Sequence, residues 1–116
     1  MRNFVLFLCV AFLSATATPT LLDATPGRRA FIGSISDSAC GLHHLMSGTP
    51  ARQCTLRCVQ MGAKFVLVDE VRQRVYALSD QIKAKAYAGQ KVRVIGTLKG
   101  SGIEVAAMTL IKQKPH

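Results

Sequence analysis

Residues 91–112 read KVRVIGTLKGSGIEVAAMTLIK, and this stretch decides the fold class. Residues 91–98 alternate between apolar and polar side chains, which is the two-residue period of a strand with one buried face. The glycine-rich residues 99–102 then predict a turn, and residues 103–112 predict a second strand. The sequence therefore indicates a β-hairpin at the end of the domain.

Three further segments upstream have strand character: residues 30–36, 64–69 and 74–79. Residues 64–69 (KFVLVD) are apolar on both faces, so we expect a central strand covered by a helix. Gly33, inside the first strand, suggests a bulge or a close approach of another backbone.

Two short helices are expected between the strands. Thr49 can cap the first, Pro50 fits its first helical position, and Gly62 fits the position just past its end. Residues 81–88 form the second, which Gly89 closes. We therefore predict a mainly β fold with one or two short helices (α+β), as a small five-stranded antiparallel barrel. Such a barrel is like the oligonucleotide/oligosaccharide-binding (OB) type, in which the usual helix lies between the third and fourth strands, so the first helix would be an insertion.

Residues 1–17 have the anatomy of a secretory signal peptide. Arg2 gives a positive start, residues 4–13 form an unbroken apolar run, and Ala15-Thr16-Ala17 offers a cleavage site. We expect cleavage after Ala17, export to the periplasm or the cell exterior, and no transmembrane segment in the mature chain.

The mature chain then divides into three parts. Residues 18–29 contain prolines, threonines and a glycine without periodicity, and we expect a flexible leader. Residues 30–112 form a single domain, and residues 113–116 form a polar tail.

The chain of 116 residues carries 15 Lys and Arg against 6 Asp and Glu, a formal net charge of +9. This excess favours anionic partners such as cell-envelope components. The basic residues form no run and no base-reading motif, so no specific nucleic-acid partner is expected. One alternative function is a polyanion- or oligosaccharide-binding OB module that uses Lys91, Arg93 and Lys99.

Residues 36–62 read SDSACGLHHLMSGTPARQCTLRCVQMG and contain every cysteine that survives loss of the signal peptide. An odd number of cysteines in an oxidising compartment leaves three options: one disulfide with a spare thiol, an intermolecular bridge, or a metal site. Cys54 and Cys58 lie four residues apart on the expected helix, with Cβ atoms about 6 Å apart. A disulfide needs about 3.8 Å. We therefore expect Cys40 to bond to Cys54 or to Cys58, which is worth about 3 kcal/mol.

The alternative is a metal site, because two thiolates on one helical face can bind one ion. Its candidate ligands are Cys40, His43, His44, Cys54 and Cys58. The spacing is near, but not the same as, known zinc spacings, and the thioethers of Met46 and Met61 would favour monovalent copper. Asp37 could orient the ligating histidine.

No enzymatic activity is expected. The cysteine spacing is C-x3-C and not the redox motif C-x-x-C, and no G-x-S-x-G nucleophile elbow occurs. The first prediction is therefore a small exported binding or envelope-interaction domain, stabilised by the Cys40 disulfide.

Three motifs carry a family resemblance: SDSxCGxxH from residue 36, CTxxCVxxGAKFVL from residue 54 and YAGxxVxVxGTL from residue 87. With them, the chain resembles a family of small exported bacterial proteins whose domain has no known function. The likeness extends over about residues 30 to 112. It implies a compact barrel-like β domain outside the cytoplasm and supplies no activity.

Overall fold

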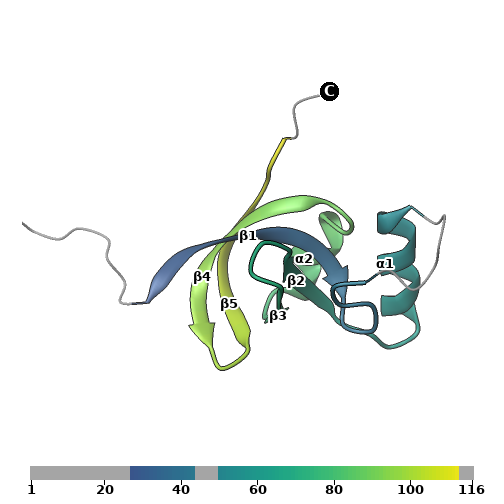
Figure 1. Ribbon diagram of the computed structural model, residues 1–116, viewed down its shortest axis with the longest axis horizontal. Coiled ribbons are helices and arrows are strands. Elements are labelled where there is room, and N and C mark those ends of the chain that lie inside the picture. Colours follow the sequence, from purple (N-terminus) through teal and green to yellow (C-terminus); the bar gives the residue numbers. More distant parts are fainter. Residues whose placement is uncertain (1–26, 44–49, 113–116) are drawn as a thin grey trace, which may run out of the picture.

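The structure is a computed structural model that describes residues 27–43 and 50–112. The described elements follow the expected order of strand, helix, two strands, helix and two strands (Figure 1). They are β1 (Arg28–Asp37), α1 (Ala51–Gln60), β2 (Phe65–Asp69), β3 (Arg74–Leu78), α2 (Gln81–Ala86), β4 (Lys91–Lys99) and β5 (Gly102–Leu110). The expected signal peptide with its cleavage site at Ala17, the thioether of Met46 and the imidazole of His44 all lie outside the described residues.

The five strands close into a barrel in the order β1-β2-β3-β5-β4. This confirms the predicted mainly β fold with two short helices and a small five-stranded barrel. One pair differs from the expected antiparallel pattern, because β3 and β5 run parallel over Ala77–Leu78 and Gly102–Ile103. The reason lies in the connection: the chain leaves β3 through α2 and reverses in β4, and the β4–β5 hairpin then returns it in the direction of β3.

Strand β1 is long enough to serve two neighbours. It pairs with β4 over Arg28–Ser34 and with β2 over Ser34–Asp37, so it changes partner at Ser34. At Gly33 a Cβ atom would lie 2.3 Å from the carbonyl oxygen of Val68. The close backbone approach expected at this glycine is therefore confirmed. The strand begins at Arg28, two residues before the expected start.

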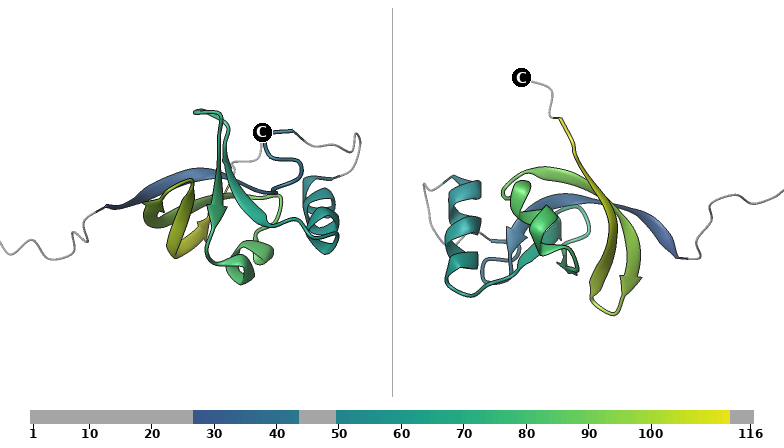
Figure 2. Two further views of the ribbon diagram at one scale, coloured as in Figure 1. Left: turned by 90° about the horizontal axis from the view of Figure 1, so that it is seen from below. Right: turned by 180° about the vertical axis from the view of Figure 1, so that it is seen from behind.

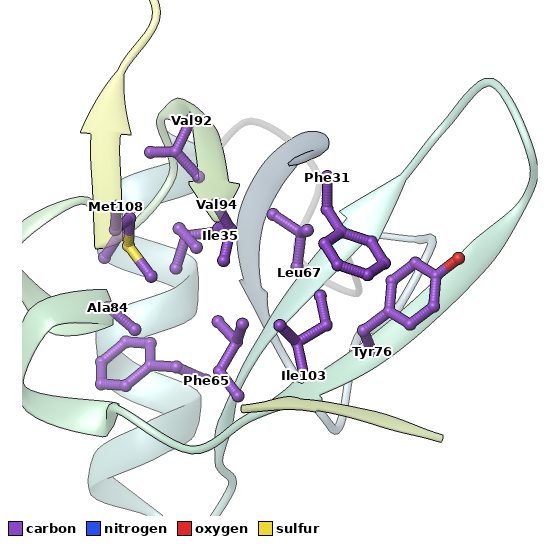
Figure 3. Close-up of a cluster of buried hydrophobic side chains, with 12 residues drawn as sticks. Phe31, Ile35, Phe65, Leu67, Tyr76, Ala84, Val92, Val94, Ile103 and Met108 are labelled. Atoms are coloured by element: carbon purple, nitrogen blue, oxygen red, sulfur yellow. The ribbon is translucent and has the colours of Figure 1, made fainter. Parts of the chain in front are cut away.

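The interior of the barrel is filled by apolar side chains from all five strands and from α2 (Figure 3). This core contains Phe31, Ile35, Phe65, Leu67, Tyr76, Leu78, Ala84, Ala88, Val92, Val94, Ile103 and Met108. Helix α2 is attached to the barrel by Gln81, whose side-chain amide bonds both the N–H of Phe65 (2.8 Å) and its carbonyl (3.0 Å). It occupies the position of the usual OB helix, between the third and fourth strands.

Helix α1 is inserted between β1 and β2 and lies beside the barrel, against β1 (Figures 1 and 2). Pro50 is the N-cap residue, with ψ of 138°, and not the first helical residue as expected. Two hydrogen bonds join the start of the inserted segment to its end. The Ser38 N–H donates to the Lys64 carbonyl (2.8 Å), and the Lys64 N–H donates to the Ser38 hydroxyl (2.9 Å).

Candidate metal centre

The three cysteines of the described chain meet between the end of β1 and helix α1. The Cys40 Sγ atom lies 3.9 Å from that of Cys54 and 3.8 Å from that of Cys58. All three sulfurs lie within 4.8 Å of one another. Cys54 has no exposed surface, and the other two are 7% exposed. The cluster is therefore a compact and buried group of sulfur atoms, separate from the barrel core.

Asp37 determines the position of Cys40. Its Oδ1 atom accepts hydrogen bonds from the N–H groups of Ala39 (3.0 Å) and Cys40 (2.9 Å), and its own carbonyl accepts from Gly41 (2.8 Å). Gly41 has φ of +54°, a conformation in which a glycine is favoured. The chain therefore turns tightly at the end of β1, and the turn places the Cys40 side chain toward α1.

Helix α1 supplies the other two sulfurs from its buried face, which consists of Cys54, Thr55 and Cys58. Positions four apart lie one above the other on a helix, so both sulfurs face Cys40. The helix ends in a Schellman motif: Gly62, with φ of +110°, donates to Val59, and Ala63 donates to the Cys58 carbonyl (3.1 Å). This motif folds Ala63 back against the cysteine cluster.

The two sulfur separations from Cys40 correspond to the spacing of thiolates around a shared ion. Zn–S bonds of about 2.3 Å in a tetrahedron place sulfurs about 3.8 Å apart, and the same bonds in a trigonal plane place them about 4.0 Å apart. A disulfide bond is much shorter, at about 2.05 Å. No disulfide bond joins Cys40, Cys54 and Cys58 in the described part of the chain. The predicted disulfide from Cys40 is not formed here.

Burial raises the pKa of the Cys58 thiol to about 12, and the thiol contact with Cys40 and the carboxyl of Asp37 act in the same direction. At neutral pH this thiol is therefore protonated in the metal-free protein. A metal ion must displace its proton, because thiolates and not thiols are the ligands.

The other predicted ligands are not part of the sulfur cluster. His43 is exposed, and its ring does not belong to the group of potential ligand atoms around Cys40. Met61 is 74% exposed. Asp37 does not orient a histidine among the described residues: Oδ1 binds backbone N–H groups, and Oδ2 is buried without a hydrogen-bond partner in that part of the chain. The hydroxyl of Thr55 is likewise buried and unpartnered there.

The sequence identified all three cysteines of the cluster. It did not identify Ala63, which packs against them, because this contact depends on the turn at Gly62 and not on any residue spacing. Lys91, Arg93 and Lys99, the basic residues of the polyanion alternative, lie exposed along β4, where Lys99 pairs with Glu104.

No protein-family model, no curated protein and no solved structure matches the chain. The resemblance to a family of small exported proteins therefore stays a prediction. Within residues 27–43 and 50–112, no helix is long and apolar enough to cross a bilayer.

Proposed function

We propose that this protein is a small exported metal-binding protein that takes one thiophilic ion, Zn²⁺ or Cu⁺, on Cys40, Cys54 and Cys58. The observation that supports this best is the convergence of three buried sulfurs at separations of 3.8 and 3.9 Å around Cys40. Soft thiolate ligands select these two ions among the common biological metals.

Three thiolates leave room for one further ligand on a zinc ion, whereas monovalent copper is satisfied by soft ligands in a lower coordination number. His43 follows Cys40 by three residues and is exposed, so it would have to turn inward to supply a fourth ligand. Structural zinc sites are closed by four protein ligands. A three-sulfur site with one open position is better suited to an ion that is accepted and passed on.

Metal binding at this site would depend on pH. The buried thiol of Cys58, with its pKa near 12, gives up a proton to the solvent when the ion binds. Binding also links the turn after β1 to helix α1, so the binding free energy would stabilise the inserted helix on the barrel.

A disulfide is the second candidate, as the sequence predicts for an exported chain. Cys40 lies almost equally far from Cys54 and Cys58, so it could bond to either after small side-chain rotations. Two thiols would then lose two hydrogens to an external oxidant, and one thiol would remain. Such a protein would be an exported binding or envelope-interaction domain stabilised by that bond, with no metal.

Thiol counting on protein purified from the host envelope separates the two candidates. We expect one zinc or copper ion per chain in the native protein. After acid release of the metal, we expect three free thiols per chain and an intact mass that reduction does not change. Cys40→Ser, Cys54→Ser and Cys58→Ser should each lower the metal affinity at least about tenfold, since each removes one of three ligands. Chelator should lower the Tm.

Two variants serve as controls. Met61→Ala removes an exposed sulfur on the same chain segment and should leave the metal affinity unchanged, and His43→Ala reports whether that imidazole completes the site. One free thiol, a mass that rises by two hydrogens on reduction and no stoichiometric metal would refute the metal proposal and establish the disulfide.

A further inference from the structure

The mouth of the barrel opens into a cleft of about 510 Å³ that none of the three clustered cysteines lines. Six residues line it: Arg29, Ala30, Phe31, Arg72, Arg74 and Tyr76. Volumes of this size accommodate small-molecule ligands, and barrel mouths are among their usual positions. We propose that this cleft is a binding site for a small polyvalent oxyanion of the phosphate class, either free or as the head group of a larger molecule.

The alternation of the strands brings two arginines into the mouth. Along β1, Arg29 shares a face with Phe31 and Ile35, and both of the latter are buried in the barrel core. Along β3, Arg74 shares a face with the buried Tyr76. Both arginines therefore continue the inward-facing rows of their strands beyond the buried core, and both are exposed there.

The aromatic pair of Phe31 and Tyr76 forms the inner wall of the cleft. The rings meet edge to face, with centroids 5.4 Å apart and an interplanar angle of 64°. The guanidinium of Arg29 lies over the Phe31 ring, 4.6 Å from its centroid. In Figure 3 the Tyr76 hydroxyl points away from the other labelled core side chains. The wall thus orients one cation and offers one hydroxyl to a bound ligand.

Arg72 is held in position by Asp69, which does not line the cleft. Its Nη1 atom donates to Oδ2 of Asp69 at 3.0 Å, and its backbone N–H donates to Oδ1 of the same side chain at 3.0 Å. Asp69 is buried and is not a lining residue of the cleft. The ion pair raises the pKa of Arg72, so this guanidinium is always charged. Its remaining N–H groups are available to a ligand.

The course of the strands leaves this region open. Strand β1 pairs with β2 only from Ser34 onward, so its first half diverges from the β2–β3 hairpin. Figure 2 shows the tip of that hairpin projecting beyond the rest of the barrel. The cleft is therefore lined by arginines from two segments of the chain: Arg29 lies on β1, whereas Arg72 and Arg74 lie at the turn of the β2–β3 hairpin and at the start of β3.

Only Arg72 among the three arginines of the cleft is paired with a described carboxylate, that of Asp69. No carboxylate lines it, and neither Arg29 nor Arg74 forms an ion pair with a described acidic residue. Guanidinium groups bind phosphate oxygens bidentately, through pairs of parallel hydrogen bonds. Three such groups together with a hydroxyl match a polyvalent tetrahedral anion better than a single carboxylate.

Calorimetric titration of the full mature protein with inorganic pyrophosphate tests this site. Arg29→Gln and Arg74→Gln should each weaken binding about tenfold, because each removes charge-assisted hydrogen bonds. Arg93→Gln, on the outer face of β4, makes the same change of charge elsewhere and should alter the affinity less than about twofold, through long-range attraction alone. Arg72 is not substituted, because its loss would leave Asp69 buried without its partner.

Co-sedimentation with vesicles that contain phosphatidylglycerol, against vesicles of phosphatidylcholine alone, distinguishes a lipid head group from a free anion. Binding in either arm that both cleft variants weaken and Arg93→Gln spares supports the site and identifies its source. Equal losses of affinity in all three variants would mean that binding depends only on the overall positive charge, and this result would overturn the proposal. So would pyrophosphate binding weaker than about 10 mM together with no binding to the anionic vesicles. Both arms use metal-free protein, so they are independent of the cysteine cluster.

Discussion

Replacement of Asp37 tests how the cysteine cluster is built, because two substitutions at this position separate its two oxygen atoms. Oδ1 accepts two backbone hydrogen bonds that form the Cys40 turn, whereas Oδ2 is buried and has no partner among the described residues. Asp37→Ala removes both oxygens. Asp37→Asn keeps an oxygen at the Oδ1 position and replaces only the unpartnered atom.

The expected magnitudes follow from these contacts. Asp37→Ala leaves the N–H groups of Ala39 and Cys40 without their acceptor in a part-buried turn, and each lost bond costs about 1 to 2 kcal/mol. We therefore expect the free energy of unfolding to fall by about 2 to 4 kcal/mol, a large part of the total for so small a domain. Asp37→Asn should change it by less than about 1 kcal/mol, since both backbone bonds are retained.

Urea denaturation of the reduced, metal-free protein measures both values, and the m-value checks that unfolding remains two-state. The rate of thiol alkylation gives a second readout. The Asp37 carboxyl contributes to the raised pKa of Cys58, so Asp37→Asn should lower that pKa and speed alkylation at a given alkaline pH. An Asp37→Asn variant as unstable as Asp37→Ala would refute the reasoning, because the charge and not the Oδ1 acceptor would then form the turn.

Two further predictions concern the framework around the sites. The Arg72 backbone N–H and guanidinium lower the pKa of Asp69 below its ordinary value. The pair therefore stabilises the fold at pH values above the ordinary carboxyl pKa, and this stabilisation is lost as the pH falls through the lowered pKa. Asp69→Asn should cost about 1 kcal/mol at pH 7, and urea titrations at pH 7 and near pH 2 to 3 should find a smaller difference from wild type at the lower pH. Gly89, with φ of +75°, would carry a Cβ 2.4 Å from the backbone nitrogen of Arg52, so Gly89→Ala should lower the free energy of unfolding by more than about 2 kcal/mol and displace α1. Gly100→Ala is its control, since φ there is +60° with nothing within 4 Å of the new Cβ, and it should cost only about 1 kcal/mol in thermal unfolding; equal losses would contradict the contact with α1.

Local periodicity was sufficient to predict the strands and the closure of the barrel. The alternation in residues 91–98 and the doubly apolar residues 64–69 became β4 and β2, because burial of one or both faces imposes those patterns. The parallel pairing of β3 with β5 could not be read in the same way. It depends on two residue pairs brought together by closure of the whole barrel, and no local pattern encodes them.

The same limit applies to the sites. Helical spacing placed Cys54 and Cys58 on one face, but the distance to Cys40 depends on the turn that Asp37 forms and on the packing of α1 against β1. At the barrel mouth, Arg29 was predicted to belong to the flexible leader, because residues 18–29 contain prolines, threonines and a glycine without periodicity. The first half of β1 is ordered by its pairing with β4, a contact across more than sixty residues of sequence.

Strand β1 connects the two proposed sites and also separates them. Arg29 and Phe31 lie at its start in the barrel mouth, and Asp37 ends it at the cysteine cluster. Eight residues of strand span up to about 26 Å, well beyond the 7 to 10 Å within which substitutions usually couple. The metal affinity should therefore be unaffected by Arg74→Gln, and pyrophosphate affinity should be unaffected by Cys54→Ser. A measurable coupling in the double variant would mean that β1 transmits a change between its ends, because none of the described side chains belongs to both sites.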